Sequence, residues 1–252
     1  ELGLEFVKVD GIKLESPEGE RNLRAFFQAV RAESQGNVTL DLDVTADKRF
    51  GYFGLLEPGP IFVQNRYTDW HRYWPHQTLR TAWQLAQWVD PVRLRLEWLN
   101  NLRNRTPYEG DPLAPERWRP DALFATVMFF APLGWFEIQN LPPRYFEEAT
   151  PLIRQWKRHR EAIHRGNILP IGSAPDGVSW TGFVSLDEQK SGGHALLFRE
   201  LNPSAAWEVE VPGAGTATRD CEVLGGEGKA RLENGVLKVE IPETLRFIWV
   251  KF

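Results

Sequence analysis

A strand–helix–strand pattern in the first 44 residues narrows the possible folds most. In the range 4–10 apolar and polar side chains alternate, so Lys8 and Asp10 point to the same side of an extended chain. The range 20–34 then carries apolar residues at the spacing of an amphipathic helix. A second alternating strand follows at 38–44. Two strands joined by a helix at this spacing predict a parallel sheet.

The same alternation of elements continues along the chain. Strands are expected at 60–65 and 92–99, and helices at 77–89 and 144–165. The apolar segment 124–136 is either a last buried strand or a buried helix, because periodicity does not separate these two cases. Repeated strand–helix units of this kind favour an α/β fold with helices packed on a parallel sheet.

The pattern changes near residue 170. Short alternating runs separated by Gly and Pro turns follow, at 178–186, 194–199, 207–211, 236–241 and 245–250. Runs of this length and spacing predict a small antiparallel β-sandwich. We therefore expect two domains, 1–169 and 170–252.

Composition excludes several classes of protein. A net charge of -4 and a pI of about 5.8 argue against nucleic acid as the main partner. The sequence has no apolar run of about 18 residues, so no membrane span is expected. The single cysteine, Cys221, excludes an intrachain disulfide and a zinc–cysteine cluster. Eleven tryptophans are compatible with carbohydrate binding, since indole faces stack on sugar rings, and equally with core packing.

The sequence opens on Glu1 and reaches its first strand almost at once. This start suggests a fragment, a processed chain or one half of a split protein. Half of a barrel would leave open strand edges. We therefore expect a second chain or an N-terminal segment to complete the sheet.

Lys8 and Asp10 stand at the carboxyl end of the first strand. A cation and a carboxylate on one face are well placed at the mouth of a (β/α) barrel, where strand ends carry the chemistry. The alternative is an ion pair that closes an exposed strand end.

The run Phe6-Val7-Lys8-Val9-Asp10 resembles the lysine–x–aspartate strand of the α-galactosidases of glycoside hydrolase family 36 and its clan relatives. The stretch 61–72, which contains Asp69, resembles the later strand whose following loop supplies the acid/base. The runs 133–137 and 166–169 resemble the end of such a barrel and the start of its sandwich. The resemblance implies an α/β fold: the C-terminal part of a (β/α)8 barrel, without its first three or so strands, followed by an antiparallel β-sandwich.

The resemblance also implies roles for individual residues. Asp10 would be the nucleophile, Lys8 would help to hold the sugar, and Asp69 would be the acid/base. The sequence departs from the family where a serine–aspartate pair is usual, since Asn65 and Arg66 stand there. The glycine-rich, arginine-containing loop of the family is also replaced, by 44–49. The alternative for Asp69 is a helix N-cap or a loop residue that accepts backbone hydrogen bonds.

Three further residues are candidates for substrate binding. Asp43 faces inward at a strand end, where it would bind sugar hydroxyls or pair with Lys48 or Arg49. Arg66 would reach a hydroxyl or brace Asp10. Trp70 would stack on the sugar or pack in the core. His71 and His76 lack ligand spacing with other His, Cys or acidic residues, so neither a metal site nor another cofactor is expected.

The sequence therefore predicts a retaining glycoside hydrolase for α-linked, α-galactoside-like substrates. A retaining enzyme needs two carboxyl groups about 5–5.5 Å apart. Asp10 would attack the sugar, and Asp69 would protonate the leaving oxygen and then activate water. The alternative is a catalytically degenerate barrel half that binds carbohydrate or serves as a scaffold. The predicted partners are an oligosaccharide or glycoside and the segment that completes the barrel, without nucleic acid or membrane.

Overall fold

The structure is a computed structural model that describes most of the chain. The described residues are 3–45, 49–55, 59–64, 73–102, 105–134, 136, 138–189, 192–216 and 218–252.

Five strands form one parallel sheet, in the spatial order β1-β2-β3-β4-β5. Their bounds are β1 (Phe6–Val9), β2 (Thr39–Asp43), β3 (Ile61–Phe62), β4 (Leu94–Trp98) and β5 (Ala131–Gly134). The order in space equals the order in sequence, because each connection crosses to the neighbouring strand. The predicted strand–helix–strand unit and its parallel pairing are confirmed, with Lys8 opposite Asp41 in the register.

The four α-helices in the described part of the chain all begin with a proline: α1 (Pro17–Glu33), α2 (Pro75–Leu85), α3 (Pro120–Ala125) and α4 (Pro143–Arg165). Proline suits the first helical position, where no N–H is needed for the helix ladder. The Ser16 side chain also caps α1 by accepting a hydrogen bond from the Gly19 N–H at 3.1 Å. Short 3₁₀ turns complete the connections: η1 (Phe50–Gly54), η2 (Pro91–Arg93), η3 (Thr106–Tyr108), η4 (Pro115–Arg117) and η5 (Ile138–Asn140).

The apolar segment 124–136 contains both structures between which the sequence could not decide. Helix α3 ends at Ala125 and β5 begins at Ala131, and the linking residues Val127 to Phe130 are fully buried. Pro132 is tolerated in β5 because β5 is the last strand of the described sheet. A buried turn between two buried elements explains why the whole run looked uniformly apolar.

The first strand, β1, is largely exposed. Within the described part of the chain β1 pairs with β2 on one side only, and Phe6 is 43% exposed. Only Val9 of this strand is buried. An outer strand lacks a neighbour on one edge, so alternation in the sequence identified the strand but not its burial.

The remaining strands form two antiparallel sheets, ordered β11-β14-β8-β7-β6 and β10-β12-β13-β9. Their bounds are β6 (Asn167–Gly172), β7 (Trp180–Leu186), β8 (Gly193–Arg199), β9 (Ala206–Glu210), β10 (Arg219–Asp220), β11 (Glu222–Gly226), β12 (Lys229–Glu233), β13 (Val236–Glu240) and β14 (Arg246–Lys251). The two sheets enclose a core of their own that includes Val184, Leu197, Leu237 and Ile248. The antiparallel sheet begins at Asn167, inside the first predicted domain, and the division into 1–169 and 170–252 stays a prediction.

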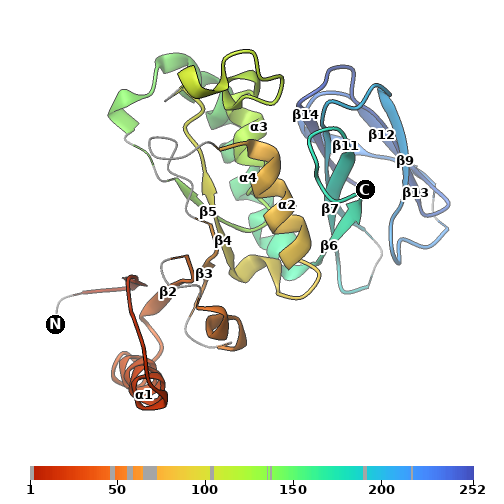
Figure 1. Ribbon diagram of the computed structural model, residues 1–252. Helices are drawn as coiled ribbons and strands as arrows, with labels where there is room; N and C mark the ends of the chain where they lie inside the picture. The colour runs from red at the N-terminus through yellow and green to blue at the C-terminus, as the bar shows by residue number, and fades with distance from the viewer. Residues whose placement is uncertain are drawn as a thin grey trace.

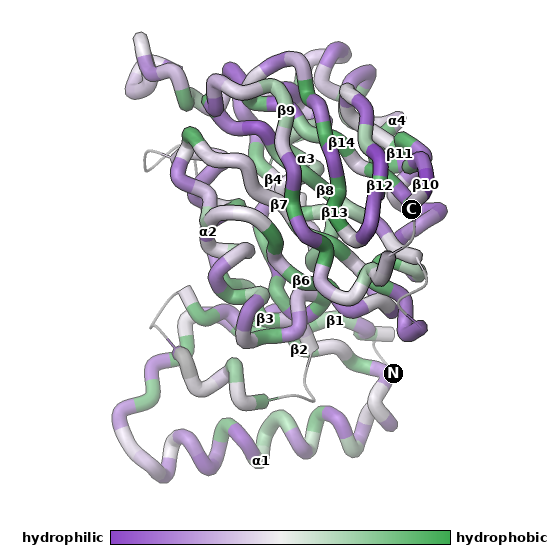
Figure 2. Tube along the Cα trace, turned by 90° about the vertical axis from the view of Figure 1, so that its right-hand side faces the viewer, coloured by the Kyte–Doolittle hydropathy of each residue, from purple (hydrophilic) through white to green (hydrophobic). Residues whose placement is uncertain are grey.

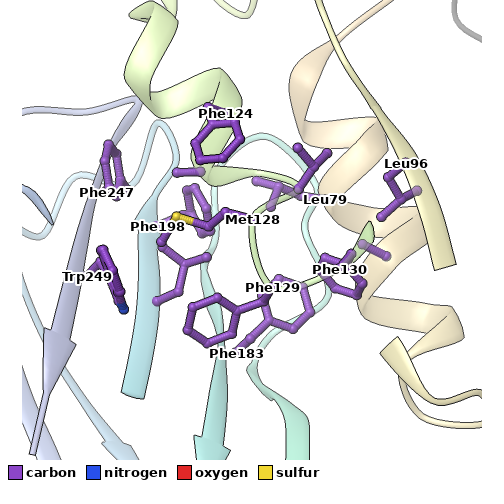
Figure 3. Close-up of a cluster of buried hydrophobic side chains, with 14 of the residues drawn as sticks. Leu79, Leu96, Phe124, Met128, Phe129, Phe130, Phe183, Phe198, Phe247 and Trp249 are labelled. Atoms are coloured by element: carbon purple, nitrogen blue, oxygen red, sulfur yellow. The ribbon is translucent and has the colours of Figure 1, made fainter. Parts of the chain in front are cut away.

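Helices α2, α3 and α4 lie between the parallel sheet and the antiparallel sheets (Figure 1). One hydrophobic core joins these layers: Phe129 and Phe130 belong to a cluster that also contains Leu96 of β4 and Phe183 of β7 (Figure 3). The parallel sheet and the sandwich therefore share buried surface.

Helix α1 lies apart from the other helices (Figure 1). Its colours alternate along the tube between hydrophobic and hydrophilic (Figure 2), and Leu23 and Phe27 on its apolar side pack against Leu40 and Leu42 of β2. Among the helices of the described residues, none has the length and apolar character needed to cross a membrane.

Candidate active site

The two faces of the parallel sheet have opposite chemistry. Leu40, Leu42, Ile61, Leu94 and Leu96 alternate onto the face covered by helices and are buried there. The opposite face carries polar residues from three strands together with an aromatic ring, and their contacts place them side by side: Lys8, Asp10, Asp41, Asp43, Phe62 and Arg95. We call this set the strand-end cluster.

Lys8 is the centre of the strand-end cluster. Its Nζ lies 3.2 Å from Asp10 Oδ2 and 2.9 Å from Asp43 Oδ2. It also lies 4.5 Å from the centroid of the Phe62 ring. Burial lowers the pKa of Lys8, but hydrogen bonds to Asp43 and Asp10 outweigh it and the net shift is upward. Lys8 is therefore a cation held between two carboxylates.

Asp10 is the accessible member of the cluster. Its side chain is 53% exposed, whereas that of Lys8 is 20% exposed. Asp10 directly follows β1, so its carboxylate stands at the carboxyl end of the parallel sheet. The structure thus places Lys8 and Asp10 together as the alternation predicted.

Asp43 is buried, and both of its oxygens have protein partners. Oδ1 accepts hydrogen bonds from the Thr45 backbone N–H at 2.7 Å and from the Thr45 hydroxyl at 2.6 Å. Oδ2 contacts the Lys8 ammonium. Arg49, one of the two alternative partners considered for Asp43, pairs with Glu20 at 2.8 Å. Lys48, the other expected partner, lies outside the described residues.

Asp41 and Arg95 form a second, deeper pair that the sequence did not select as site residues. Arg95 Nε lies 3.5 Å from Asp41 Oδ1, and the Arg95 guanidinium covers the Phe6 ring at 4.8 Å. Burial raises the pKa of Asp41 to about 6, although Arg95 and Lys8 oppose this shift. Alternation in the sequence could have identified this pair. Asp41 lies on the same face of its strand as Asp43, and Arg95 lies on the polar face of its own strand.

Glu97 lies two residues after Arg95 on β4 and is buried. The polar face therefore extends across β1, β2 and β4.

Three predicted site residues, Asp69, Arg66 and Trp70, lie outside the described residues, as does His71. Their roles, and the separation of the Asp10 and Asp69 carboxyls, stay predictions. His76 is described; burial lowers its pKa, with Asp111 and Asp176 opposing. Among the described residues no group of three or more His, Cys, Asp or Glu could hold a metal ion.

The cluster has a definite chemical capacity. An exposed carboxylate 3.2 Å from an ammonium is oriented by that contact, as a nucleophile or an electrostatic stabiliser requires. The second carboxyl group that general acid catalysis would need is not among the exposed residues of this cluster.

Comparison with solved structures identifies proteins of the same fold. The chain superposes on α-galactosidase AgaA of glycoside hydrolase family 36 from Geobacillus stearothermophilus, solved in complex with raffinose, with a TM-score of 0.71 and 12% identity. The match covers 98% of this chain and 35% of that one. The galactosidase domain of the α-galactosidase–sucrose kinase AgaSK gives a TM-score of 0.68 at 12% identity, over 98% and 34% of the two chains.

A maltogenic α-amylase, AmyB from Thermotoga neapolitana, also shares the fold, with a TM-score of 0.55, 10% identity, and coverage of 98% of this chain and 60% of its own. The chain spans about a third of the length of the α-galactosidase chains it matches. No protein-family model matches the sequence, and no curated protein matches it. The likeness to part of the family 36 α-galactosidases is thus a likeness of fold.

Proposed function

We propose that this chain is part of a retaining glycoside hydrolase that acts on α-galactoside-like substrates. The observation that carries the proposal is the strand-end cluster: an exposed carboxylate, Asp10, beside a clamped lysine, Lys8, at the carboxyl end of a parallel sheet. The shared fold with family 36 α-galactosidases supports it. Strand ends of this kind are where barrel enzymes place their chemistry.

In the proposed mechanism Asp10 attacks the anomeric carbon and forms a glycosyl-enzyme. Asp69 protonates the leaving oxygen and afterwards removes a proton from the attacking water. Lys8 binds sugar hydroxyls and stabilises the ionised nucleophile. Arg66 and Trp70 are the further proposed substrate contacts, the first by hydrogen bonds and the second by stacking.

The proposed catalytic unit is a closed (β/α)8 barrel. In the described sheet β1 and β5 are the outer strands, each paired on one side. Leu4 is 58% and Phe6 43% exposed beside the free edge of β1. Such an edge favours pairing with further strands. We propose that a second chain or an N-terminal segment supplies them, and that activity requires it.

One observation favours a second candidate function. Arg66 stands where the resembling family carries its acid aspartate, so the acid/base is displaced to Asp69 or missing. A protein that lost this acid would still present the strand-end cluster to a sugar. The second candidate is therefore a catalytically inactive carbohydrate-binding or scaffolding barrel.

An assay with an aryl α-galactoside on the complete protein tests the proposal. Asp10→Ala should lower kcat by about 10³-fold or more, because the glycosyl-enzyme cannot form. Asp220→Ala, an exposed carboxylate of the sandwich, is the matched control and should leave the rate unchanged. Proton NMR of the first sugar released should show retained anomeric configuration.

Equal rates for the wild type and Asp10→Ala would reject the hydrolase. Calorimetric titration with the same α-galactoside then decides the second candidate, since saturable binding without turnover is what a degenerate barrel should give.

A further inference from the structure

Lys8 has two carboxylate partners in the strand-end cluster, one of them exposed and the other buried. The side chain of Asp10 is 53% exposed, whereas that of Asp43 is 1% exposed. We propose that Asp43 is a positioning residue that holds Lys8 in place beside Asp10, and that it does not bind the sugar itself. This inference rests on the proposed function and assigns Asp43 a different role from the substrate contact that the sequence suggested.

Both carboxylate oxygens of Asp43 already have hydrogen-bond partners within the protein. A carboxylate oxygen accepts about two hydrogen bonds. Asp43 Oδ1 already accepts two, from the N–H and the hydroxyl of Thr45. Oδ2 accepts from Lys8 at 2.9 Å. A buried carboxylate with these partners offers a sugar hydroxyl neither a free Oδ1 nor an exposed approach.

The Lys8 ammonium is held in place by its neighbours in the sheet. A lysine ammonium ends a flexible four-carbon stem, which loses rotamer entropy when the ammonium is held in one place. Asp43 ends a strand that pairs on both sides, so its position is set by the sheet. The Phe62 ring contacts the same ammonium. Lys8 is thereby held by rigid groups below, while Asp10 approaches it from the exposed side.

The turn at the end of β2 orients the Asp43 carboxylate. Thr45 follows Asp43 by two residues and turns the chain out of β2. Its N–H and hydroxyl orient the carboxylate plane so that Oδ2 points to Lys8. The sequence Asp-x-Thr at a strand end therefore orients the Asp43 carboxylate by local contacts, whereas Lys8 and Phe62 come from the two neighbouring strands. We call the hold of Asp43 on Lys8 the clamp.

A double-mutant cycle in the complete protein tests the assignment. Asp43→Asn should lower kcat about 10- to 100-fold with KM changed less than about threefold, because Asp43 makes no sugar contact of its own. Lys8→Met should lower the rate at least as much. The double variant should be within about threefold of Lys8→Met alone, since Asp43 acts through Lys8. If Asp43 contacts the sugar directly, the two losses should multiply and KM should rise for Asp43→Asn.

Asp41→Asn is the matched control, because it removes a buried carboxylate from the same strand whose ion-pair partner is Arg95. Its effect should multiply with that of Lys8→Met. Thr45→Val provides a milder variant should Asp43→Asn fold poorly, and Thr45→Ser should restore the wild-type rate. Equal coupling of Asp41 and Asp43 to Lys8 would overturn the assignment.

A readout that does not depend on turnover separates this inference from the proposed function. After reductive ¹³C-methylation of lysines, the NMR signal that Lys8→Arg removes reports the titration of Lys8. Its midpoint should fall in Asp43→Asn relative to the wild type. If the wild type is inactive but the Lys8 midpoint falls in Asp43→Asn, the hydrolase proposal is rejected and the role of Asp43 in holding Lys8 is supported. If the midpoint does not change, that role is rejected whatever the activity.

Discussion

The carboxylates of this protein differ in their burial and in the groups that they contact. Asp10 stands in solvent beside Lys8, Asp43 is buried and clamped, and Asp41 is buried next to Arg95. Glu200, far along the chain in the sandwich, is also buried, and its Oε2 accepts hydrogen bonds from the N–H groups of Asp176, Gly177 and Ser179 at 3.1, 2.9 and 3.0 Å. Residue type alone therefore does not fix the charge state of an acid here.

Glu200 gives a prediction at the residue scale. Burial raises the pKa of Glu200 to about 7 from 4.5, although three backbone hydrogen bonds oppose this. A raised pKa means that its contribution to stability is present below pH 4.5 and is lost as the pH rises to about 7. Glu200→Gln, which keeps an acceptor oxygen, should flatten this decline by an amount on the order of 3 kcal/mol. Urea unfolding of both proteins at pH 5 and pH 8 measures it; parallel declines would contradict the prediction.

Individual elements are joined at defined contacts, and the contact between α4 and the sandwich is titratable. His159 on α4 and His194 on β8 meet with Nδ1 and Nε2 3.2 Å apart, and both rings contact the Trp249 ring. Such a contact holds one proton between the two nitrogens, so it cannot persist when both rings are protonated. The joint between helix and sheet is therefore built for neutral histidines.

Lowering the pH should loosen this joint. Burial lowers the pKa of His194 to about 4, and His159 and Lys251 add to the effect. The pKa of His159 is also lowered, by burial and then by Lys251 and Arg158, with Glu222 opposing. Depressed histidine pKa values give stability that is present above pH 6.5 and is lost as the pH falls toward 4.

The test substitutes the buried ring of this pair. In His194→Gln the glutamine side chain can still hydrogen-bond to His159 but does not titrate. The unfolding free energy of this variant should therefore fall less between pH 7 and pH 5 than that of the wild type. Denaturant titrations at several pH values provide the measurement. The same slope in both proteins would show that the pair does not control the acid limb.

The whole molecule is held together by one core that crosses its layers. Phe129, Phe130, Phe183 and Phe247 belong to a single cluster between the parallel and the antiparallel sheets (Figure 3). The Phe130 and Phe183 rings meet edge to face at 5.0 Å. Because this surface is shared, the two sheets around it should unfold together.

Phe129→Ala tests that cooperativity. Removing a fully buried ring should cost about 3–5 kcal/mol. Calorimetry should show one transition in the wild type and one, at lower temperature, in the variant. Phe146→Ala on the outer side of α4, where the ring is 40% exposed, is the control and should shift the transition little. Separate transitions, with only one of them moved by Phe129→Ala, would contradict a shared core.

Local pattern determined much of the architecture. Alternation at 4–10 and 38–44 predicted parallel strands, and the apolar stripes of α1, α2 and α4 predicted helices within about four residues of their observed ends. Alternation also placed Lys8 and Asp10 on one face, because side-chain direction along a strand is set by the backbone alone. Strands β6, β10, β11 and β12 were missed. β10 has only two residues, and β6 and β11 contain Pro or Gly, which weaken the pattern of a strand.

Tertiary structure decided what lies between segments distant in sequence. The ion pair of Lys8 with Asp43, the pairing of Asp41 with Arg95 and the exposure of β1 all depend on which strands become neighbours and in which register. A sequence pattern gives the direction of each side chain but not its partner across a sheet. The sequence by itself therefore determined most of the strands, three of the four described helices and the face that bears the charges. The folded chain decided which charges meet, because such contacts exist only after distant strands have paired.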